Sequence, residues 1–485
     1  MLVSELIESV KKSLFIGGQW VSAEGGKTLE VCNPADGSLL GSVADGSPSD
    51  GLRALDAAVD AAHDWARSEP RVRSEMLRKA FELLIERADD FAMLMTLEMG
   101  KPLAEAKGEV VYAAEFFRWF AEETVRIHGR YAAAPAGNTR LVTMKQPVGP
   151  TLMITPWNFP LAMGTRKIGP ALAAGCTMVV KPAHETPLTM LALVALLEEV
   201  GVPPGVVNLV TTSTSGEVCE PLMRDPRLRK VTFTGSTPVG RKLVEQSAEQ
   251  LLRTSMELGG NAPFIVFEDA DLDAAVEGAL LAKMRNIGEA CTSANRFYVH
   301  SSIAGEFSAR MAARMEALRV APGAEDGSQV GPLITQKARA GVDELVQDAV
   351  AKGAKVLTGG AIPDGAGFFY PPTVLGDVPP DARVFKEEIF GPVAPITTFD
   401  DEDEVLQRAN DTEFGLVAYF FTKDNARVIR VSETLEYGMV GVNTGIVSNP
   451  AAPFGGMKHS GFGREGGFEG IDEYLEVKYV GMAGL

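Results

Sequence analysis

From about residue 148, short apolar runs alternate with helical stretches, and this alternation constrains the fold more than any other feature. The apolar runs have strand length and stand at 151–155, 177–181, 206–210, 230–234 and 254–258, with predicted helices near 164–174, 188–200 and 237–250. Continuous apolar strands separated by helices indicate a parallel sheet that helices cover on both faces. Such a sheet binds ligands at the carboxyl ends of its strands.

A second alternating series starts at residues 263–267, just after Gly259-Gly260, and continues to about residue 440. It predicts a second α/β domain. Ahead of the first series, residues 52–67 and 76–96 each carry apolar residues on one helical face and predict amphipathic helices. The segments 125–147 and 471–480 alternate like strands without an evident neighbouring partner. They can pair with each other or with another subunit.

Bulk properties exclude several classes of protein. The chain has 485 residues, enough for two or three domains, and its net charge of -18 argues against non-specific nucleic-acid binding and against attraction to an anionic membrane. No run of 18 apolar residues is present, and residues 1–10 lack a signal or presequence pattern. The four cysteines and five histidines show no metal-ligand spacing and no disulfide framework. We expect a cytoplasmic protein without a metal site.

The first candidate for chemistry is the segment Gly235–Gly240, directly after the apolar run 230–234. Ser236 or Thr237 can cap the next helix, and Pro238 suits its first turn. A helix N-terminus that opens after a strand is a natural pyrophosphate site. The spacing matches neither GxGxxG nor a P-loop, so an ordinary strand-to-helix turn is the alternative.

Cys291 is the second candidate. It stands in a polar stretch with Asn286, Glu289 and Thr292, where packing explains little, whereas Cys176 lies in an apolar run typical of a buried small residue. An activated thiolate is a strong nucleophile near neutral pH.

Two further candidates lie at or just after the ends of predicted strands. Glu257 precedes Gly259-Gly260 and can act as a general base at the strand's carboxyl end, although paired glycines also mark plain turns. Asn158 lies between Pro156 and Pro160, where a fixed amide can stabilise an oxyanion, although the loop can equally be only a rigid turn.

Together these motifs resemble the aldehyde dehydrogenase superfamily over essentially the whole chain. Glu257 stands 34 residues before Cys291, as in the family pattern, and the C-terminal signatures recur at 387–392, 453–456 and 463–465. The resemblance implies an α/β fold with a Rossmann-type cofactor domain, an α/β catalytic domain and a small β-extension for oligomerisation. The corresponding segments are 1–124 with 148–259 for the cofactor domain, 260–459 for the catalytic domain, and 125–147 with 460–485 for bridging between subunits.

The resemblance also implies the roles of the candidates. Cys291 attacks the aldehyde, its own amide and Asn158 stabilise the alkoxide, and Glu257 activates the water that hydrolyses the thioester. The implied cofactor residues are Thr155, Trp157, Lys181, His184, Gly235, Ser236, Gly240, Leu258, Glu388 and Phe390. Members that prefer NAD carry Glu where this chain has His184, so we expect NADP, with NAD also accepted.

Within the superfamily, residues 261–280 and 436–466 are most similar to succinate-semialdehyde dehydrogenases. The resemblance implies that Arg166, Arg285 and Ser448 bind a carboxylate at the far end of the aldehyde, which suits the planar guanidinium. The alternative for each arginine is a structural ion pair. A glutarate-semialdehyde dehydrogenase, a broader aliphatic enzyme, a cofactor-independent thiol esterase and an inactive scaffold are the competing functions. We expect a homodimer or homotetramer.

Two more positions depart from the family pattern. Glu289 replaces the usual Gln two residues before the nucleophile, and an inward-facing ionised carboxylate there would raise the pKa of the thiol. Ser293 stands where many relatives of the subgroup have a second Cys, which removes a vicinal disulfide.

Overall fold

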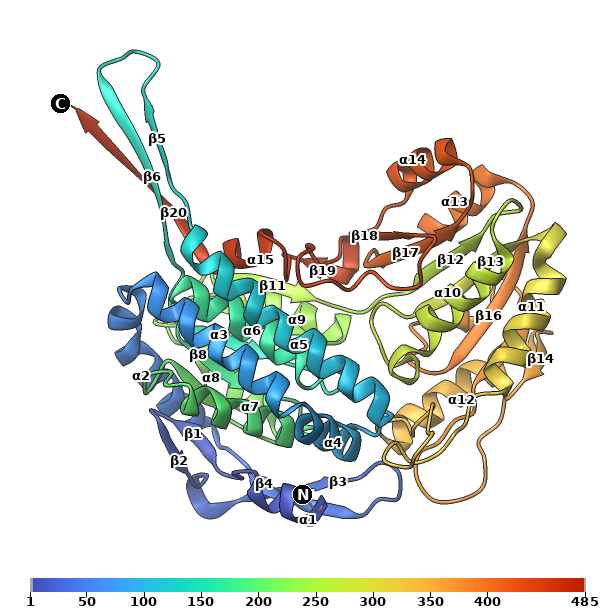
Figure 1. Cartoon of the computed structure of the whole chain (residues 1–485), viewed down its shortest axis with the longest axis horizontal. Helices are drawn as coiled ribbons and strands as arrows, with labels where there is room; N and C mark the ends of the chain where they lie inside the picture. The colour runs from blue at the N-terminus through green and yellow to red at the C-terminus, as the bar shows by residue number, and fades with distance from the viewer. Residues whose placement is uncertain (1–2, 484–485) are drawn as a thin grey trace.

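The computed structural model describes residues 3–483 and contains two large sheets that lie side by side (Figure 1). The first sheet has the order β19-β11-β10-β7-β8-β9-β1-β2. Its strands from β11 to β9 are parallel, and its edge strands are antiparallel. The strands are β1 (Leu14–Ile16), β2 (Gln19–Val21), β7 (Thr151–Ile154), β8 (Met178–Lys181), β9 (Val207–Leu209), β10 (Lys230–Thr234), β11 (Arg253–Glu257) and β19 (Gly461–Phe462).

Helices cover both faces of this sheet, as the continuous apolar strands predicted. In β7, Met153 packs into the core formed with α3 to α7, while Leu152 and Ile154 pack into the core formed with α2, α8 and α9. The helices are α1 (Val3–Ser9), α2 (Pro48–Ala66), α3 (Pro70–Glu86), α4 (Ala88–Met99), α5 (Leu103–Glu123), α6 (Ala162–Ala174), α7 (Pro187–Glu199), α8 (Ser215–Arg224) and α9 (Thr237–Ser247). Among residues 3–483, no helix combines the length and apolar character needed to cross a membrane.

The second sheet has the order β14-β15-β16-β13-β12-β17-β18 and is parallel except for β14. Phe264 and Val266 of β12 face one core, and Ile265 faces the other. The strands are β12 (Ala262–Val266), β13 (Ala294–His300), β14 (Lys355–Thr358), β15 (Thr373–Gly376), β16 (Val393–Phe399), β17 (Val417–Phe421) and β18 (Met439–Val442). The helices are α10 (Leu272–Met284), α11 (Ser301–Glu316), α12 (Gln336–Ala351), α13 (Glu402–Asn410) and α14 (Asn425–Thr434).

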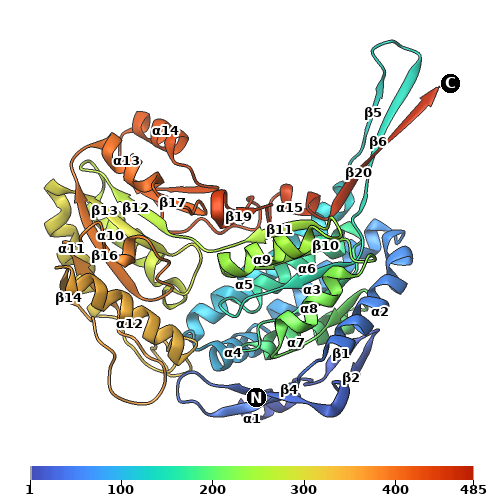
Figure 2. The same cartoon turned by 180° about the vertical axis from the view of Figure 1, so that it is seen from behind.

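A three-stranded arm projects from the first sheet (Figures 1 and 2). It consists of β5 (Arg130–Ala133), β6 (Thr139–Pro147) and β20 (Leu475–Ala483), and β20 pairs antiparallel with β6 along nine residues. The two segments that lacked neighbouring partners therefore pair with each other within one chain. Residues 125–147 form a hairpin where the alternation suggested one strand, and the tail starts with a short helix, α15 (Glu469–Asp472). A separate hairpin joins β3 (Thr28–Cys32) and β4 (Leu39–Ala44).

The helix predicted over residues 76–96 is wrong as one element. The chain leaves helical geometry at Arg87, which has φ -102° and ψ 23°, so α3 ends at Glu86 and α4 begins at Ala88. The Arg87 guanidinium donates to both carboxylate oxygens of Glu199 at the end of α7, at 2.8 and 2.6 Å. The apolar residues of the two helices still face one core, which explains why the periodicity looked continuous.

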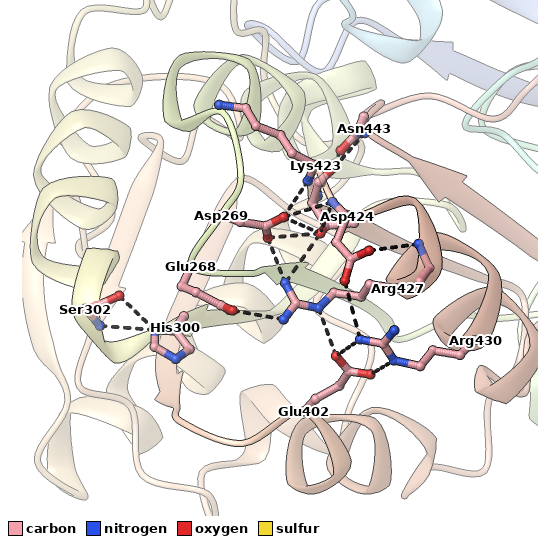
Figure 3. Close-up of polar contacts among 12 residues, drawn as sticks. Glu268, Asp269, His300, Ser302, Glu402, Lys423, Asp424, Arg427, Arg430 and Asn443 are labelled. Atoms are coloured by element: carbon pink, nitrogen blue, oxygen red, sulfur yellow. Dashed lines mark hydrogen bonds and ion pairs between the residues drawn. The ribbon is translucent and has the colours of Figure 1, made fainter.

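An arginine network ties the strand ends of the second sheet together (Figure 3). Arg427 of α14 donates to Glu268, Asp269 and Glu402 at 2.9, 2.7 and 2.8 Å, and its guanidinium lies over the Phe267 ring. We call Arg427 and these three carboxylates the Arg427 network. It joins the segment after β12 to α13 and α14.

Candidate active site

The carboxyl ends of four strands meet at one edge of the first sheet. The register pairs Ile154 with Lys181 and Thr234 with Glu257. The chain passes from β7 to β8 and β9 on one side and returns to β10 on the other side of β7. Such a switch point is where α/β sheets bind ligands. It brings the loop after β7, with Trp157 and Asn158, beside the turn after β10.

A cavity of about 240 Å³ opens at this edge. Trp157 and Phe390 meet edge to face in its wall, with ring centroids 5.5 Å apart. The predicted site residues that line the cavity come from five separate segments and are Trp157, Asn158, Gly235, Ser236, Glu257, Leu258, Cys291, Glu388 and Phe390.

Four predicted cofactor residues lie outside this cavity. Thr155 is buried, and its amide donates to the Lys181 carbonyl at 3.1 Å. Lys181 donates through Nζ to the Ser215 hydroxyl at 2.9 Å, and burial lowers its pKa. The exposed His184 ring lies 3.3 Å from a Glu185 carboxylate oxygen.

Gly240, the fourth, lies inside α9. A Cβ at this position would overlap the Leu258 side chain, so its small size lets α9 pack closely against the segment after β11. The predicted turn is therefore limited to Gly235 and Ser236. Ser236 is the N-cap residue of α9, but its side chain makes no capping hydrogen bond, and Pro238 lies in the first turn.

Cys291 lies between two cavities. On one side it lines the 240 Å³ cavity, and on the other it lines a small pocket together with Arg166, Arg285 and Ser448. Burial raises the pKa of the Cys291 thiol to about 12, with Arg166 opposing the shift and Glu388 and Glu257 adding to it. The resting thiol is therefore protonated at neutral pH and needs activation to attack.

Glu257 is a buried carboxyl group whose two oxygens have no hydrogen-bond partner among residues 3–483. Burial and the nearby charge of Glu465 raise its pKa well above the usual range. Burial also opposes ionisation of Glu465, but Arg166 and Lys167 outweigh this and lower its pKa. Two carboxyl groups with opposite shifts in one site are typical of acid–base chemistry. We call Cys291, Glu257, Arg166 and Glu465 the active-site cluster.

The Asn158 side chain is held by the loop that carries Cys291. Its Nδ2 donates to the Glu289 carbonyl at 2.9 Å, and its own carbonyl accepts from Lys101 Nζ at 2.8 Å. One Nδ2 hydrogen is used in this contact, and an amide nitrogen carries two.

The three predicted substrate residues lie together. Arg285 donates through Nη1 to the Ser448 hydroxyl at 2.8 Å, and its guanidinium lies 5.0 Å from the centre of the Phe159 ring. Arg166 is buried, pairs with Glu465 and lies 4.0 Å from the centre of the Phe454 ring. A larger cavity of about 930 Å³ also reaches Arg285 and Ser448.

The Glu289 carboxyl group contacts the Ile334 backbone. Its Oε1 accepts from the Ile334 amide at 3.2 Å, and burial raises its pKa well above the usual value. Burial and the contact to Ile334 both differ from the inward-facing ionised carboxylate that would raise the thiol pKa, and Glu289 is not among the groups that shift the pKa of Cys291.

Lys101 and Glu109 were missed by sequence reasoning. They form a buried ion pair, and Glu109 also accepts from the amides of Leu161 and Ala162 at 3.0 and 3.1 Å. Charged residues at the start of a helix usually face solvent, and only the mixed apolar and charged pattern of α5 hinted otherwise. Glu465 was recognised only as part of a signature, without a role.

Comparison with known proteins gives a consistent result. The aldehyde dehydrogenase family profile matches residues 20–480. The chain is 58% identical to a succinate-semialdehyde dehydrogenase of Paenarthrobacter nicotinovorans over 92% of this chain and 99% of that protein. It is 53% identical to a glutarate-semialdehyde dehydrogenase of Pseudomonas putida, and 52% identical to an Escherichia coli succinate-semialdehyde dehydrogenase named for NADP(+), each over 97% of both chains.

Solved structures agree with the sequence relatives. A crystal structure described as an E. coli NADP dependent enzyme superposes with a TM-score of 0.97 at 52% identity, over 99% of both chains. An aldehyde dehydrogenase from Bacillus cereus in complex with NAD+ superposes with a TM-score of 0.96 at 36% identity, over 99% of this chain and 98% of that one. The expected fold is confirmed, and the chain belongs to the aldehyde dehydrogenase family.

Proposed function

We propose that this enzyme oxidises succinate semialdehyde to succinate with a nicotinamide dinucleotide, through a thioester on Cys291. The position of Cys291 between two cavities carries the proposal. One cavity gathers most of the residues expected to hold the cofactor, and the other gathers two arginines and a serine. A thiol between a dinucleotide and an anion-binding pocket suits an aldehyde with a distal carboxylate.

The cavity fits a nicotinamide ribose and ring. Glu388 Oε1 accepts from the Gly260 amide at 3.0 Å, which leaves the second oxygen available for a ribose hydroxyl. Thr234 Oγ1 is buried at the cavity wall without a partner among the described residues. The nicotinamide, when bound, supplies the acceptor for the two electrons and the hydrogen that leave the aldehyde carbon.

The chain's own residues perform the remaining steps. The Cys291 thiol gives up its proton to solvent as its sulfur forms a bond to the aldehyde carbon, and the Cys291 amide and Asn158 Nδ2 stabilise the alkoxide that results. After oxidation the product is a thioester, and Glu257 takes a proton from the water that attacks it. Carbon–sulfur cleavage then releases the acid and restores the thiol.

The pair Arg285 and Ser448 supports the choice of substrate. A carboxylate bound by a guanidinium and a hydroxyl gains charge-assisted hydrogen bonds of about 1.5–3 kcal/mol each. Both succinate- and glutarate-semialdehyde dehydrogenases are among the similar proteins, and one methylene is discriminated by only about 1–3 kcal/mol. Glutarate semialdehyde is therefore the second candidate.

A panel of aldehydes tests the substrate. Succinate semialdehyde should exceed butanal in kcat/KM by at least about 100-fold, and Arg285→Ala should remove most of this advantage without changing the rate with butanal. Lys458→Ala, whose ammonium contacts Glu436 at the surface, serves as the matched control. Equal rates with both aldehydes would contradict the binding of a distal carboxylate by Arg285 and Ser448 but leave the family assignment unchanged.

NADP is the proposed cofactor, with NAD also used. His184 occupies the place of the acidic residue that would repel a 2′-phosphate, and Lys181 lies nearby with its Nζ on Ser215. Steady-state kinetics with both cofactors test this assignment. His184→Glu should shift the ratio of kcat/KM toward NAD, and a strong preference of the unmodified enzyme for NAD would contradict it.

We further propose that the arm of β5, β6 and β20 joins copies of the chain into a homodimer or homotetramer. Tyr131, Val477 and Tyr479 on the arm are 67%, 67% and 60% exposed, which is unusual for such side chains. Light scattering tests the assembly. We also propose a cytoplasmic location. We propose a division into a cofactor domain (1–124 and 148–259), a catalytic domain (260–459) and bridging segments (125–147 and 460–485).

A further inference from the structure

Asn286 is buried on the loop that leads into the proposed nucleophile, Cys291. Its side chain contacts the loop of the proposed oxyanion donor, Asn158. Its Nδ2 donates to the Asn158 carbonyl at 3.0 Å and to the Glu289 carbonyl at 2.9 Å. The Glu289 carbonyl also accepts from Asn158 Nδ2 at 2.9 Å. These three hydrogen bonds form a closed set in which both Nδ2 hydrogens of Asn286 are used.

The backbone around Asn286 is held in an unusual conformation. Asn286 has φ +55°, Ile287 has φ +63° and Gly288 has φ +80°. Asparagine tolerates this left-handed region, whereas a β-branched isoleucine rarely adopts it. The backbone amide of Asn286 donates to the Glu105 carboxylate of α5. A Cβ on Gly288 would overlap the Gly391 carbonyl. The surroundings therefore over-determine the turn that leads into Cys291.

The Asn158 loop is fixed to the same helix by other contacts. Lys101, just before α5, donates to the Asn158 carbonyl at 2.8 Å and pairs with Glu109. Glu109 holds the amides of Leu161 and Ala162. Both loops are therefore anchored on the first half of α5. The side-chain amide of Asn286 links them directly through its hydrogen bonds to the Asn158 and Glu289 carbonyls.

We infer that Asn286 is a positioning residue that sets the Asn158 side chain relative to the Cys291 thiol. This inference rests on the proposed function, because it assigns Asn286 the task of aligning the oxyanion donor of that reaction. Stabilisation of an alkoxide depends steeply on donor geometry, and a misplacement of about 1 Å can cost about 100-fold in rate. The side chain of Asn286 lines neither of the two cavities that Cys291 lines.

A double-mutant cycle between Asn286→Gly and Asn158→Ala tests the inference. Glycine accepts the left-handed φ without strain, so the substitution removes the amide contacts and spares the backbone. Asn286→Gly should lower kcat about 10- to 100-fold with KM changed less than about threefold. In the Asn158→Ala background the same substitution should cause almost no further loss. Additive losses would overturn the inference.

The rate of Cys291 alkylation by iodoacetamide separates positioning from collapse of the loop. Alkylation forms no oxyanion, so Asn286→Gly should leave this rate nearly unchanged. A fall in alkylation equal to the fall in aldehyde oxidation would overturn the inference. If the glycine variant does not fold, Asn286→Asp replaces it in the same cycle, because it keeps the shape and its carboxyl group can donate at most one of the two hydrogen bonds.

Asp377→Gly is the matched control, since Asp377 also has φ +48° but lies exposed beside Lys355. It should not change kcat, and its effects should be additive with those of Asn158→Ala. A wild-type enzyme that reduces neither NAD nor NADP with any aldehyde would overturn the proposed function, and the inference with it. An active wild type with additive losses would overturn the inference alone.

Discussion

Two arginines in this molecule, Arg427 and Arg166, are each surrounded by carboxylates but differ in how completely they are paired. In the Arg427 network all three guanidinium nitrogens donate to carboxylates (Figure 3). In the active-site cluster, Arg166 is 1% exposed and pairs only with Glu465, and its Nη2 has no hydrogen-bond partner among the described residues. Neither carboxyl oxygen of Glu257 has a hydrogen-bond partner among the described residues.

This difference teaches which network serves stability and which serves chemistry. A buried polar group without a partner costs free energy, so proteins retain it where a ligand or a reaction needs it. The complete Arg427 network fixes strand ends, whereas the incomplete active-site cluster leaves donors and acceptors unpaired, as the proposed reaction requires for substrate and water. Substitutions in the two regions should therefore separate loss of stability from loss of activity.

The largest effect is expected at Cys291. Cys291→Ser should lower aldehyde oxidation by roughly 10⁴-fold or more, because a serine hydroxyl is a much weaker nucleophile in this buried site. The midpoint of thermal unfolding should stay within a few degrees of the wild type. Steady-state rates and calorimetry measure the two effects, and undiminished oxidation would remove Cys291 from the mechanism.

Glu257→Gln should reduce turnover by about 10²- to 10⁴-fold, the range for loss of a general base. Because the pKa of Glu257 is raised by burial and by Glu465, the folded protein binds the Glu257 proton more tightly than the unfolded chain. Stability from this group is present at low pH and is lost as pH rises through the raised pKa. Thermal unfolding of wild type and variant from pH 4 to 9 should show the variant gaining relative stability at high pH. A constant difference would contradict the shift.

Arg427→Met should lower stability and leave activity unchanged, the opposite of the effect expected for Cys291→Ser. It leaves three carboxylates without their shared partner, and we expect a loss of about 1–3 kcal/mol in the free energy of unfolding, with kcat unchanged at temperatures where the protein is folded. Arg430→Met is the matched control, since this neighbour is 48% exposed and its substitution should lower the free energy of unfolding much less than Arg427→Met does. Urea unfolding measures both. A large fall in kcat for Arg427→Met would show that the two networks are coupled.

The smallest effect is expected for Glu289→Gln. Burial raises the pKa of Glu289 and so disfavours its charged form, and glutamine is an uncharged group of the same shape. Turnover should change by less than about threefold, with the Ile334 contact retained. A collapse in rate would assign Glu289 a catalytic part.

Much of the sheet could be predicted from the sequence because its strands are continuous apolar runs. The runs at 151–155 and 230–234 match β7 and β10 closely, and the motifs at Asn158, Gly235 and Glu257 follow strands whose register brings their ends together. For these strands, the local sequence of apolar residues was sufficient for the prediction.

Contacts between distant segments could not be predicted in the same way. The break at Arg87 coincides with a contact to Glu199, and the pairing of Lys101 with Glu109 and Asn158 requires knowing that α5 lies against the loop after β7. Asn286 looked like one polar residue among several in its loop. The positioning role inferred for Asn286 depends on its hydrogen bond to the Asn158 carbonyl, which lies 128 residues away in the sequence.

The pairing of β6 with β20 also has a consequence for biosynthesis. A ribosome must add residues 148–474 after finishing β6 before it can deliver the strand that covers its edge. During that interval the β5–β6 hairpin exposes unpaired backbone groups, which are a template for pairing with other nascent chains. The arm therefore cannot be completed until β20 has been synthesised, and until then the edge of β6 lacks the strand that covers it.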